Sequence, residues 1–189
     1  MFRLTNEEKS FLFRLARRSL EAAVHGEALE APAQFPAPLG SLGGAFVTLH
    51  RNGALRECVG YVQALKPLYQ TVMEAAEAAA LHDTRFPQVG PAELAGLEVE
   101  ISLLSPCQEA RLEEIQVGVH GLMVSQGFAR GLLLPQVAVE RNWTPLRFLE
   151  ETCRKAGLPP AAWRRGAKIE VFTAEVFSER TLAIEELRG

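Results

Sequence analysis

The strongest constraint on the fold of this chain is the dipeptide Asn52-Gly53. From Ala45 up to this dipeptide, apolar residues occupy every second position, and residues 55–61 after it are typical of a return strand. The Asn-Gly pair favours a two-residue type I′ turn, because both central residues of that turn take a positive φ. The sequence therefore predicts an antiparallel hairpin over residues 45–61.

A two-residue turn also fixes which residues of the hairpin lie opposite each other. Counting back from the turn sets Leu49 opposite Arg56 and Val47 opposite Cys58. Arg56 and Cys58 are then predicted on the more apolar face, with Cys58 deep in it. Glu57 is predicted on the other, more polar face, together with Thr48 and His50.

Helix and loop signals surround this hairpin. Thr5 and Glu8 form a capping box, after which apolar residues recur at helical spacing up to Gly26. The other elements predicted in this half are a Pro-rich irregular loop over residues 27–40, a helix that begins at Pro67 and ends before Pro87, and a strand over residues 99–103. The first half is thus predicted to run helix, hairpin, helix, strand.

The second half repeats the order hairpin, helix, strand. Its predicted elements are a strand over residues 119–124, a turn at Gln126-Gly127, a strand over 128–134, helical sequence from Pro135, a helix from Thr144 to Gly157, and a strand over 168–177. Arg56 lies three residues after Gly53, and Arg130 three residues after Gly127, so both arginines are predicted at the same rung of their hairpins. An internal duplication explains this, and chance recurrence of a common order is the alternative. The fold class is α+β, a mainly antiparallel sheet with flanking helices.

The predicted turn at Gln126-Gly127 also determines the surroundings of His120. It sets Met123 opposite Arg130 and His120 opposite Leu133. His120 is then expected as a lone imidazole on an apolar face.

The segment Leu55-Arg56-Glu57-Cys58-Val59-Gly60 resembles the signature leucine-arginine-glycine-cysteine-isoleucine-glycine of the AMMECR domain family. The other segments that carry the resemblance follow in order, at residues 67–68, 83–87, 97–106, 118–121, 131–137 and 155–158. The chain is accordingly interpreted as a single AMMECR-type domain over residues 1–189. Its family core is placed at residues 43–179, and residues 1–40 form the N-terminal helix and Pro-rich loop. Glu57 departs from the signature, where a glycine stands.

The resemblance implies a mixed α+β fold with a main antiparallel sheet, but no established reaction. Bacterial and archaeal members are often encoded beside, or fused to, Memo-like and radical-SAM proteins. It therefore implies a modification pathway with such proteins as partners. A nucleic-acid role has been suggested for the family, but the net charge of −3 argues against a basic surface that grips phosphates. The alternative to an enzyme is a non-catalytic binding or adaptor domain.

Cys58 and His120 are the candidate catalytic residues, the thiol as nucleophile and the imidazole as general base. A positive charge at Arg56 would lower the pKa of the thiol. The alternative for Cys58 is a buried cysteine that packs as a small apolar side chain. The alternative for His120 is a histidine whose ring nitrogens are bonded to the backbone.

Arg56, Arg85, Arg130 and Glu57 are the candidate ligand-binding residues. The arginines are predicted to form a conventional anion-binding cleft for a small anionic ligand, because the guanidinium fork matches carboxylate and phosphate. Glu57 is grouped with them because a carboxylate at the departure from the signature alters what such a cleft binds. The alternative is structural: Arg56 pairs with Glu57 or Glu100, and Arg85 holds Asp83 or loop carbonyls.

The remaining motifs indicate no cofactor and no metal. His82 and Asp83 lack a third ligand at suitable spacing, and neither glycine-rich phosphate motif is present. The three cysteines are far apart and form no CxxC motif, so a reducing, cytoplasmic environment is expected. The N-terminus is too polar for a signal peptide, and no apolar run is long enough to span a membrane.

Overall fold

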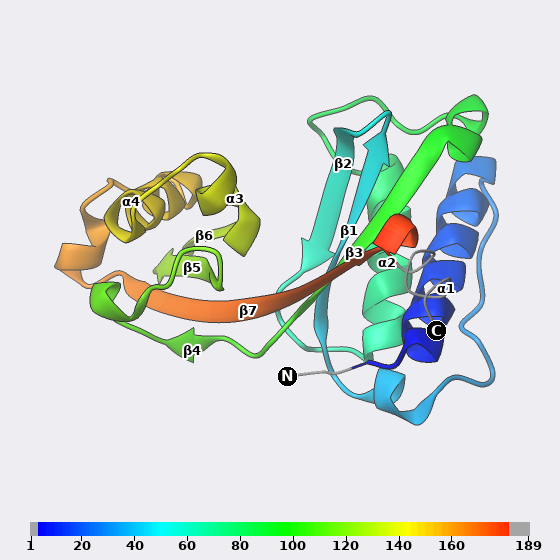
Figure 1. Ribbon diagram of the computed structural model, residues 1–189. Helices are drawn as coiled ribbons and strands as arrows, with labels where there is room; N and C mark the ends of the chain where they lie inside the picture. The colour runs from blue at the N-terminus through cyan, green and yellow to red at the C-terminus, as the bar shows by residue number, and fades with distance from the viewer. Residues whose placement is uncertain (1–3, 182–189) are drawn as a thin grey trace. The chain divides into compact units, whose positions relative to one another are not determined.

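The computed structural model describes residues 4–181, which divide into two compact units. The first unit contains the described residues up to Leu104 and those from Glu175 onward, and the second is Ser105–Ala174. Strand β7 (Lys168–Ser178) begins in the second unit and ends in the first (Figure 1). The fold is the predicted mixed α and β type, with antiparallel strands flanked by helices. None of the helices within residues 4–181 is long and apolar enough to cross a membrane.

The described part of the first unit contains three complete strands and two complete helices. In chain order its elements are α1 (Asn6–His25), a 3₁₀ turn at Ala37–Gly40, β1 (Gly44–Arg51), β2 (Ala54–Tyr61), α2 (Leu68–Leu81), a 3₁₀ turn at Pro91–Gly96 and β3 (Leu97–Leu104). Strand β1 lies between β2 and β3, so β2 forms an edge of the sheet. The predicted capping box of Thr5 and Glu8 and the left-handed stop at Gly26 are confirmed at the ends of α1.

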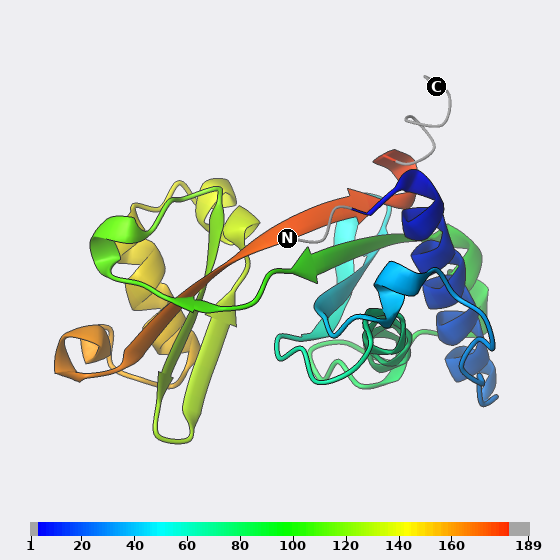
Figure 2. The same cartoon turned by 90° about the horizontal axis from the view of Figure 1, so that it is seen from below.

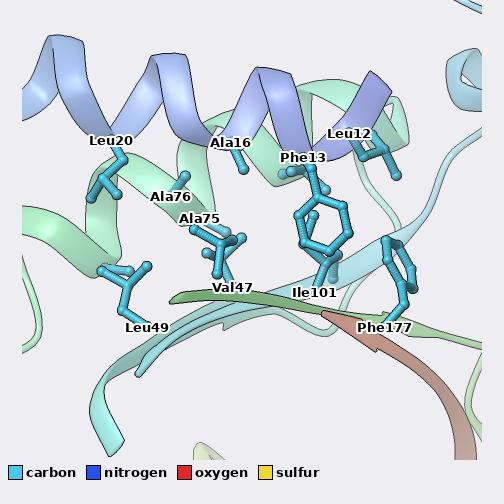
Figure 3. Close-up of a cluster of buried hydrophobic side chains, with 14 of the residues drawn as sticks. Leu12, Phe13, Ala16, Leu20, Val47, Leu49, Ala75, Ala76, Ile101 and Phe177 are labelled. Carbon is cyan, nitrogen blue, oxygen red and sulfur yellow. The ribbon is translucent and has the colours of Figure 1, made fainter. Parts of the chain in front are cut away.

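The core of this unit lies between the helices and one face of the sheet (Figure 3). Val47 and Leu49 project from β1 toward α2, where the small side chains of Ala75 and Ala76 let the helix approach closely. Leu12 and other buried side chains of α1 complete the layer. Burial of these apolar groups is the main force that holds the unit together.

The second unit is a hairpin covered by helices. Its elements are β4 (Gln108–Glu109), a 3₁₀ turn at Leu112–Glu114, β5 (His120–Gln126), β6 (Ala129–Leu133), α3 (Pro135–Glu140), α4 (Pro145–Lys155), a 3₁₀ turn at Ala162–Arg165 and most of β7. The β5–β6 hairpin and its tight turn are clear in Figure 2. Thr144 caps α4 as predicted, and Phe148 and Leu149 from this helix are fully buried in the core.

The first hairpin has the predicted turn but a different register. Asn52 and Gly53 have φ values of 53° and 77°, which confirms positive φ at both turn positions. However, a β-bulge follows at Arg56, so that Glu57 lies opposite Leu49 and Cys58 lies opposite Thr48. The predicted pairings of Leu49 with Arg56 and of Val47 with Cys58 are therefore wrong. One extra residue in β2 exchanges the two faces of the strand beyond it.

The second hairpin is shifted by two residues from the prediction. Positive φ occurs at Gly127 and not at Phe128, so these two residues form the turn, with glycine at its first central position. Arg130 therefore lies opposite Ser125 rather than Met123. The shift is an even number of residues, so the predicted face of His120 is unchanged.

The two hairpins do not place Arg56 and Arg130 at the same rung. Arg56 is the unpaired bulge residue of its hairpin, whereas Arg130 is paired with Ser125 one rung from its turn. Both units do contain a hairpin followed by helix and strand. The internal duplication stays a prediction, without the support that equivalent arginines would have given it.

Candidate functional site

The bulge in β2 sends two neighbouring side chains to opposite faces of the sheet. Glu57 shares the face of its pairing partner Leu49, which is the face covered by the helices, and is only 1% exposed. Cys58 shares the face of Thr48 and is half-buried. The sequence had predicted the opposite arrangement, with the thiol in the core and the carboxylate outside. Of these two neighbouring side chains, the buried one is thus the carboxylate of Glu57 and not the thiol of Cys58.

The open edge of β2 is closed at Cys58 by two side chains from the turn after α2. The backbone N–H of Cys58 donates to Asp83 Oδ2 at 3.1 Å, and the carbonyl of Cys58 accepts from Arg85 Nη2 at 3.1 Å. Arg85 in turn donates from Nε to Asp83 Oδ1 at 2.9 Å and from Nη2 to Asp83 Oδ2 at 2.6 Å. Asp83 and Arg85 therefore take the places that a neighbouring strand would fill.

Arg56 is bonded through all three of its guanidinium nitrogens. Nη1 donates to Glu57, Nε and Nη2 each donate to Glu93 at 3.2 Å, and Nη2 also donates to the carbonyl of Pro87 at 3.0 Å. This side chain fastens the bulge to the loop that precedes β3. The pairing of Arg56 with Glu57, and of Arg85 with Asp83, is the arrangement that the structural alternative predicted.

The carboxyl group of Glu57 has an unusual environment. Burial raises its pKa to about 7, against the opposing attraction of Arg56, and the negative charge of Asp83 raises it further. One of its oxygens, Oε2, is buried without a hydrogen-bond partner among the described residues. The pKa of Asp83 is instead held well below its usual range, chiefly by hydrogen bonds from Arg85. The two carboxyl groups therefore differ in charge near neutral pH.

The thiol of Cys58 belongs to a row of polar residues on the face opposite the helices. Thr48 Oγ1 lies 3.3 Å from Cys58 Sγ, and Thr48 pairs on its other side with Glu100 of β3. His50 Nε2 lies 3.9 Å from Glu100 Oε1. Burial raises the pKa of the Cys58 thiol, while the Thr48 hydroxyl and the charge of Arg85 oppose that rise. The thiol is therefore protonated at neutral pH.

Sequence reasoning did not single out several of these contacts. Thr48 and His50 were assigned to the face of Glu57, because the bulge was not foreseen. The role of Glu93 was missed, although the sequence carried a signal for it. Glu93 stands three residues after Gly90, the cap of the following 3₁₀ turn, and a carboxylate at this spacing is typical of a capping box. In the structure, Glu93 Oε2 accepts a hydrogen bond from the N–H of Gly90 at 3.0 Å.

His120 and Arg130 belong to the second unit. His120 is half-buried, and its Nδ1 accepts a hydrogen bond from the backbone N–H of Gln116 at 3.3 Å. This is the backbone-bonded state that the structural alternative for His120 predicted. Arg130 is exposed on β6. Among residues 4–181, no group of three or more His, Cys, Asp or Glu side chains is placed to hold a metal ion.

Known proteins resemble the chain over nearly its whole length. The AMMECR1 family model matches residues 13–177. Protein TK0174 of Thermococcus kodakarensis is 44% identical over 192 residues, covering 95% of this chain and 94% of that protein. A protein of Methanothermobacter thermautotrophicus is 42% identical over 185 residues, with 93% and 96% covered.

A solved structure has the same fold. The crystal structure of uncharacterized protein PH0010 from Pyrococcus horikoshii superposes with a TM-score of 0.89 at 41% identity, and the match covers 94% of each chain. Both the family model and these relatives extend across the bulge, the Asp83 turn and the second unit. The chain therefore belongs to the AMMECR1 family.

Proposed function

We propose that this chain binds an anionic group at the exposed side of Arg85, close to the thiol of Cys58. The observation that supports the proposal is the hydrogen bonding and exposure of the Arg85 guanidinium. Its Nε and Nη2 are held by Asp83 and by the carbonyl of Cys58, whereas Nη1 has no hydrogen-bond partner among the described residues. The guanidinium also lies over the ring of Phe86, with 5.5 Å between Cζ and the ring centroid. The side chain is 50% exposed. A guanidinium that is fixed on one side and open on the other is preorganised for carboxylate or phosphate.

Arg56 has a supporting role. All of its nitrogens are bonded to Glu57, Glu93 or Pro87, so an incoming anion would have to break existing ion pairs. In this proposal Arg56 holds the bulge in place and Arg85 meets the ligand. Arg130 and His120 have no assigned role in this proposal. The substitutions R130Q and H120Q test whether either residue contributes to anion binding.

The proposed biological setting is a modification pathway shared with Memo-like and radical-SAM proteins. Its support is the family membership together with a thiol beside an anion site, since such a pair suits a substrate with an acidic group. The test is co-purification of the tagged chain with the Memo-like and radical-SAM proteins of its own genome. Co-purification with the wild-type chain that is lost with R85Q supports this setting. If the wild-type chain co-purifies with neither protein at low salt, the setting is contradicted.

Alkylation of Cys58 tests the anion site directly. Iodoacetamide labelling, read out by peptide mass spectrometry, should be slowed by inorganic phosphate in a saturable way, because the bound anion covers the thiol. Cys107 and the buried Cys153 are internal references in the same sample. R85Q should lose the protection, and R85K should retain part of it. No protection at about 10 mM phosphate, or equal protection in R85Q, would overturn the proposal.

A second candidate function is a non-catalytic binding or adaptor domain. Leu55, Tyr61 and Leu65, within and just after the edge strand β2, are exposed large apolar residues. Exposed apolar groups along a sheet edge suit contact with a protein partner. The substitution C58S separates the two functions: an adaptor keeps its partner with this change, whereas a thiol enzyme loses turnover.

The cysteines support a proposed compartment. Cys58, Cys107 and Cys153 are all free, as expected of a protein in a reducing environment. The cytoplasmic location is therefore part of the proposal, and fractionation of cells that express the tagged chain tests it.

A further inference from the structure

Asp83 connects the buried carboxyl group of Glu57 to the guanidinium of Arg85. Glu57 is 1% exposed on the face of β2 that the helices cover, and Asp83 lies at the edge of the strand, where its side chain is 5% exposed. The two carboxyl groups are in hydrogen-bonding contact with each other. Asp83 also holds Arg85 through both of its oxygens, at 2.9 and 2.6 Å. A chain of hydrogen bonds therefore leads from the core to the anion site.

The contact between the two carboxyl groups is favourable only when one of them carries a proton. Ionised carboxylates offer acceptors and no donor, so two of them side by side repel each other. Both oxygens of Asp83 already accept hydrogen bonds from Arg85 or from the N–H of Cys58, which hold Asp83 in its charged form. One oxygen of Glu57 is buried without a partner among the described residues. A protonated Glu57 supplies the missing donor.

The neighbours of Glu57 bring its titration close to neutral pH. The charged groups that act on it are Arg56 of β2 and Asp83 and Arg85 of the turn after α2. Strand β1 and helix α2, which pack on the same side of the sheet, present Leu49 and a row of alanines there. Burial, with the help of Asp83, outweighs the attraction of Arg56, so the pKa of Glu57 is about 7.

We propose that Glu57 is a positioning residue that makes anion binding at Arg85 depend on a proton. This role rests on the proposed function, since it requires the anion site. With its proton, Glu57 is neutral and donates to Asp83, which keeps Arg85 in place. Without the proton, a second negative charge beside Asp83 weakens the attraction of the site for an anion. The anion and the proton therefore favour each other's binding, and anion binding takes up a proton from solution.

Calorimetric titration of the whole chain with sodium sulfate at pH 6, 7 and 8 measures this coupling. Sulfate keeps the same charge over this range, whereas phosphate does not. The dissociation constant of wild type should rise about threefold or more from pH 6 to pH 8, across the pKa of Glu57. At pH 7, titrations in two buffers of different ionisation enthalpy should show uptake of about 0.3 protons for each sulfate bound.

Substitutions assign the proton to Glu57. E57Q keeps the shape of the side chain and cannot ionise, so it should bind sulfate equally at pH 6 and pH 8 and take up no proton. H50Q and H82Q are controls for imidazole groups, which as a class change charge in this pH range. E30Q, at an exposed position of the loop after α1, is the control for a carboxylate. All three controls should keep the pH dependence of wild type, and R85Q should lose sulfate binding at every pH.

The possible failures can be told apart. A wild-type dissociation constant that is equal at pH 6 and pH 8 would overturn the role of Glu57 while the anion site stands. So would a pH dependence that persists in E57Q, or one that disappears in H50Q or H82Q. Undetectable binding at about 10 mM sulfate and pH 6 would overturn the anion site as well.

Discussion

Asp83 accepts a hydrogen bond from the backbone N–H of Cys58 at 3.1 Å, on the open edge of strand β2. A strand edge offers unpaired N–H and C=O groups to any other chain, and proteins cover such edges. Here the cover is a carboxylate and, beside it, the Arg85 guanidinium on the carbonyl of the same residue. The motif Asp83-Thr84-Arg85 therefore has a structural function. Only the exposed side of the Arg85 guanidinium is available to bind a ligand.

The substitution D83A should destabilise the first unit by about 2 kcal/mol. It leaves the N–H of Cys58 without its acceptor and removes the ion-pair partner of Arg85. R85A should cost less, about 1 kcal/mol, because the Arg85 side chain is half exposed. Urea unfolding at neutral pH measures both. A D83A variant as stable as wild type would show that the edge does not need this cap.

Glu57 should make the folded state lose stability as pH rises between about 5 and 8. Its folded pKa, about 7, is above that of an unfolded glutamate, so the folded state binds the proton more tightly. This contribution is complete below the unfolded pKa and is lost as pH rises through the folded pKa. The charged groups around the carboxyl are Arg56, Asp83 and Arg85. The size is about 3–4 kcal/mol, from the difference between the two pKa values.

The variant E57Q should remove this pH dependence. It keeps the shape of the side chain and cannot ionise, so its unfolding free energy should be flatter from pH 5 to 8 than that of wild type. Measurements above about pH 5 avoid Asp83 and Glu93, whose lowered pKa values remove stability only in acid. Parallel pH profiles for wild type and E57Q would refute the assignment.

Gly60, the last residue of the signature, should not tolerate a side chain. A Cβ there would overlap the carbonyl oxygen of Ala45 and the ring of Phe46. G60A is therefore expected to cost about 2 kcal/mol or more, the usual range for overpacking. G96A is the matched control, because a methyl group on Gly96 would meet no atom within 4 Å and the φ of this residue is not positive. Thermal unfolding of both variants decides the point, and equal melting temperatures would contradict it.

Local signals in the sequence predicted much of this fold, because they depend on neighbouring residues. The cap at Thr5, the turn at Asn52-Gly53 and the cap at Thr144 are each determined by side chains within a few positions, and all three are confirmed. The period of two likewise located β1 and β3. The order of elements and the fold class followed from these signals together.

The register at the candidate site was not predictable in this way. The bulge at Arg56 is accompanied by contacts to Glu93 and Pro87, 37 and 31 residues away, and Cys58 is held by Asp83, 25 residues away. The predicted register was obtained by counting residue pairs from the turn. This assumes strand pairing without a bulge and takes no account of these distant partners. The error exchanged the faces of Glu57 and Cys58, which changed the expected chemistry of both.

Arg17 provides a last test, at the junction of α1 with the end of the sheet. Its Nε and Nη2 donate to Glu179 at 2.7 and 2.6 Å, and it also donates to the carbonyls of Leu94 and Leu97. A lysine cannot reproduce this fork, because it presents a single nitrogen. R17K should therefore lower the unfolding free energy by about 1–3 kcal/mol. R14K, at an exposed position of the same helix, should change it by less than about 0.5 kcal/mol, and equal effects of the two substitutions would refute a specific role for the fork.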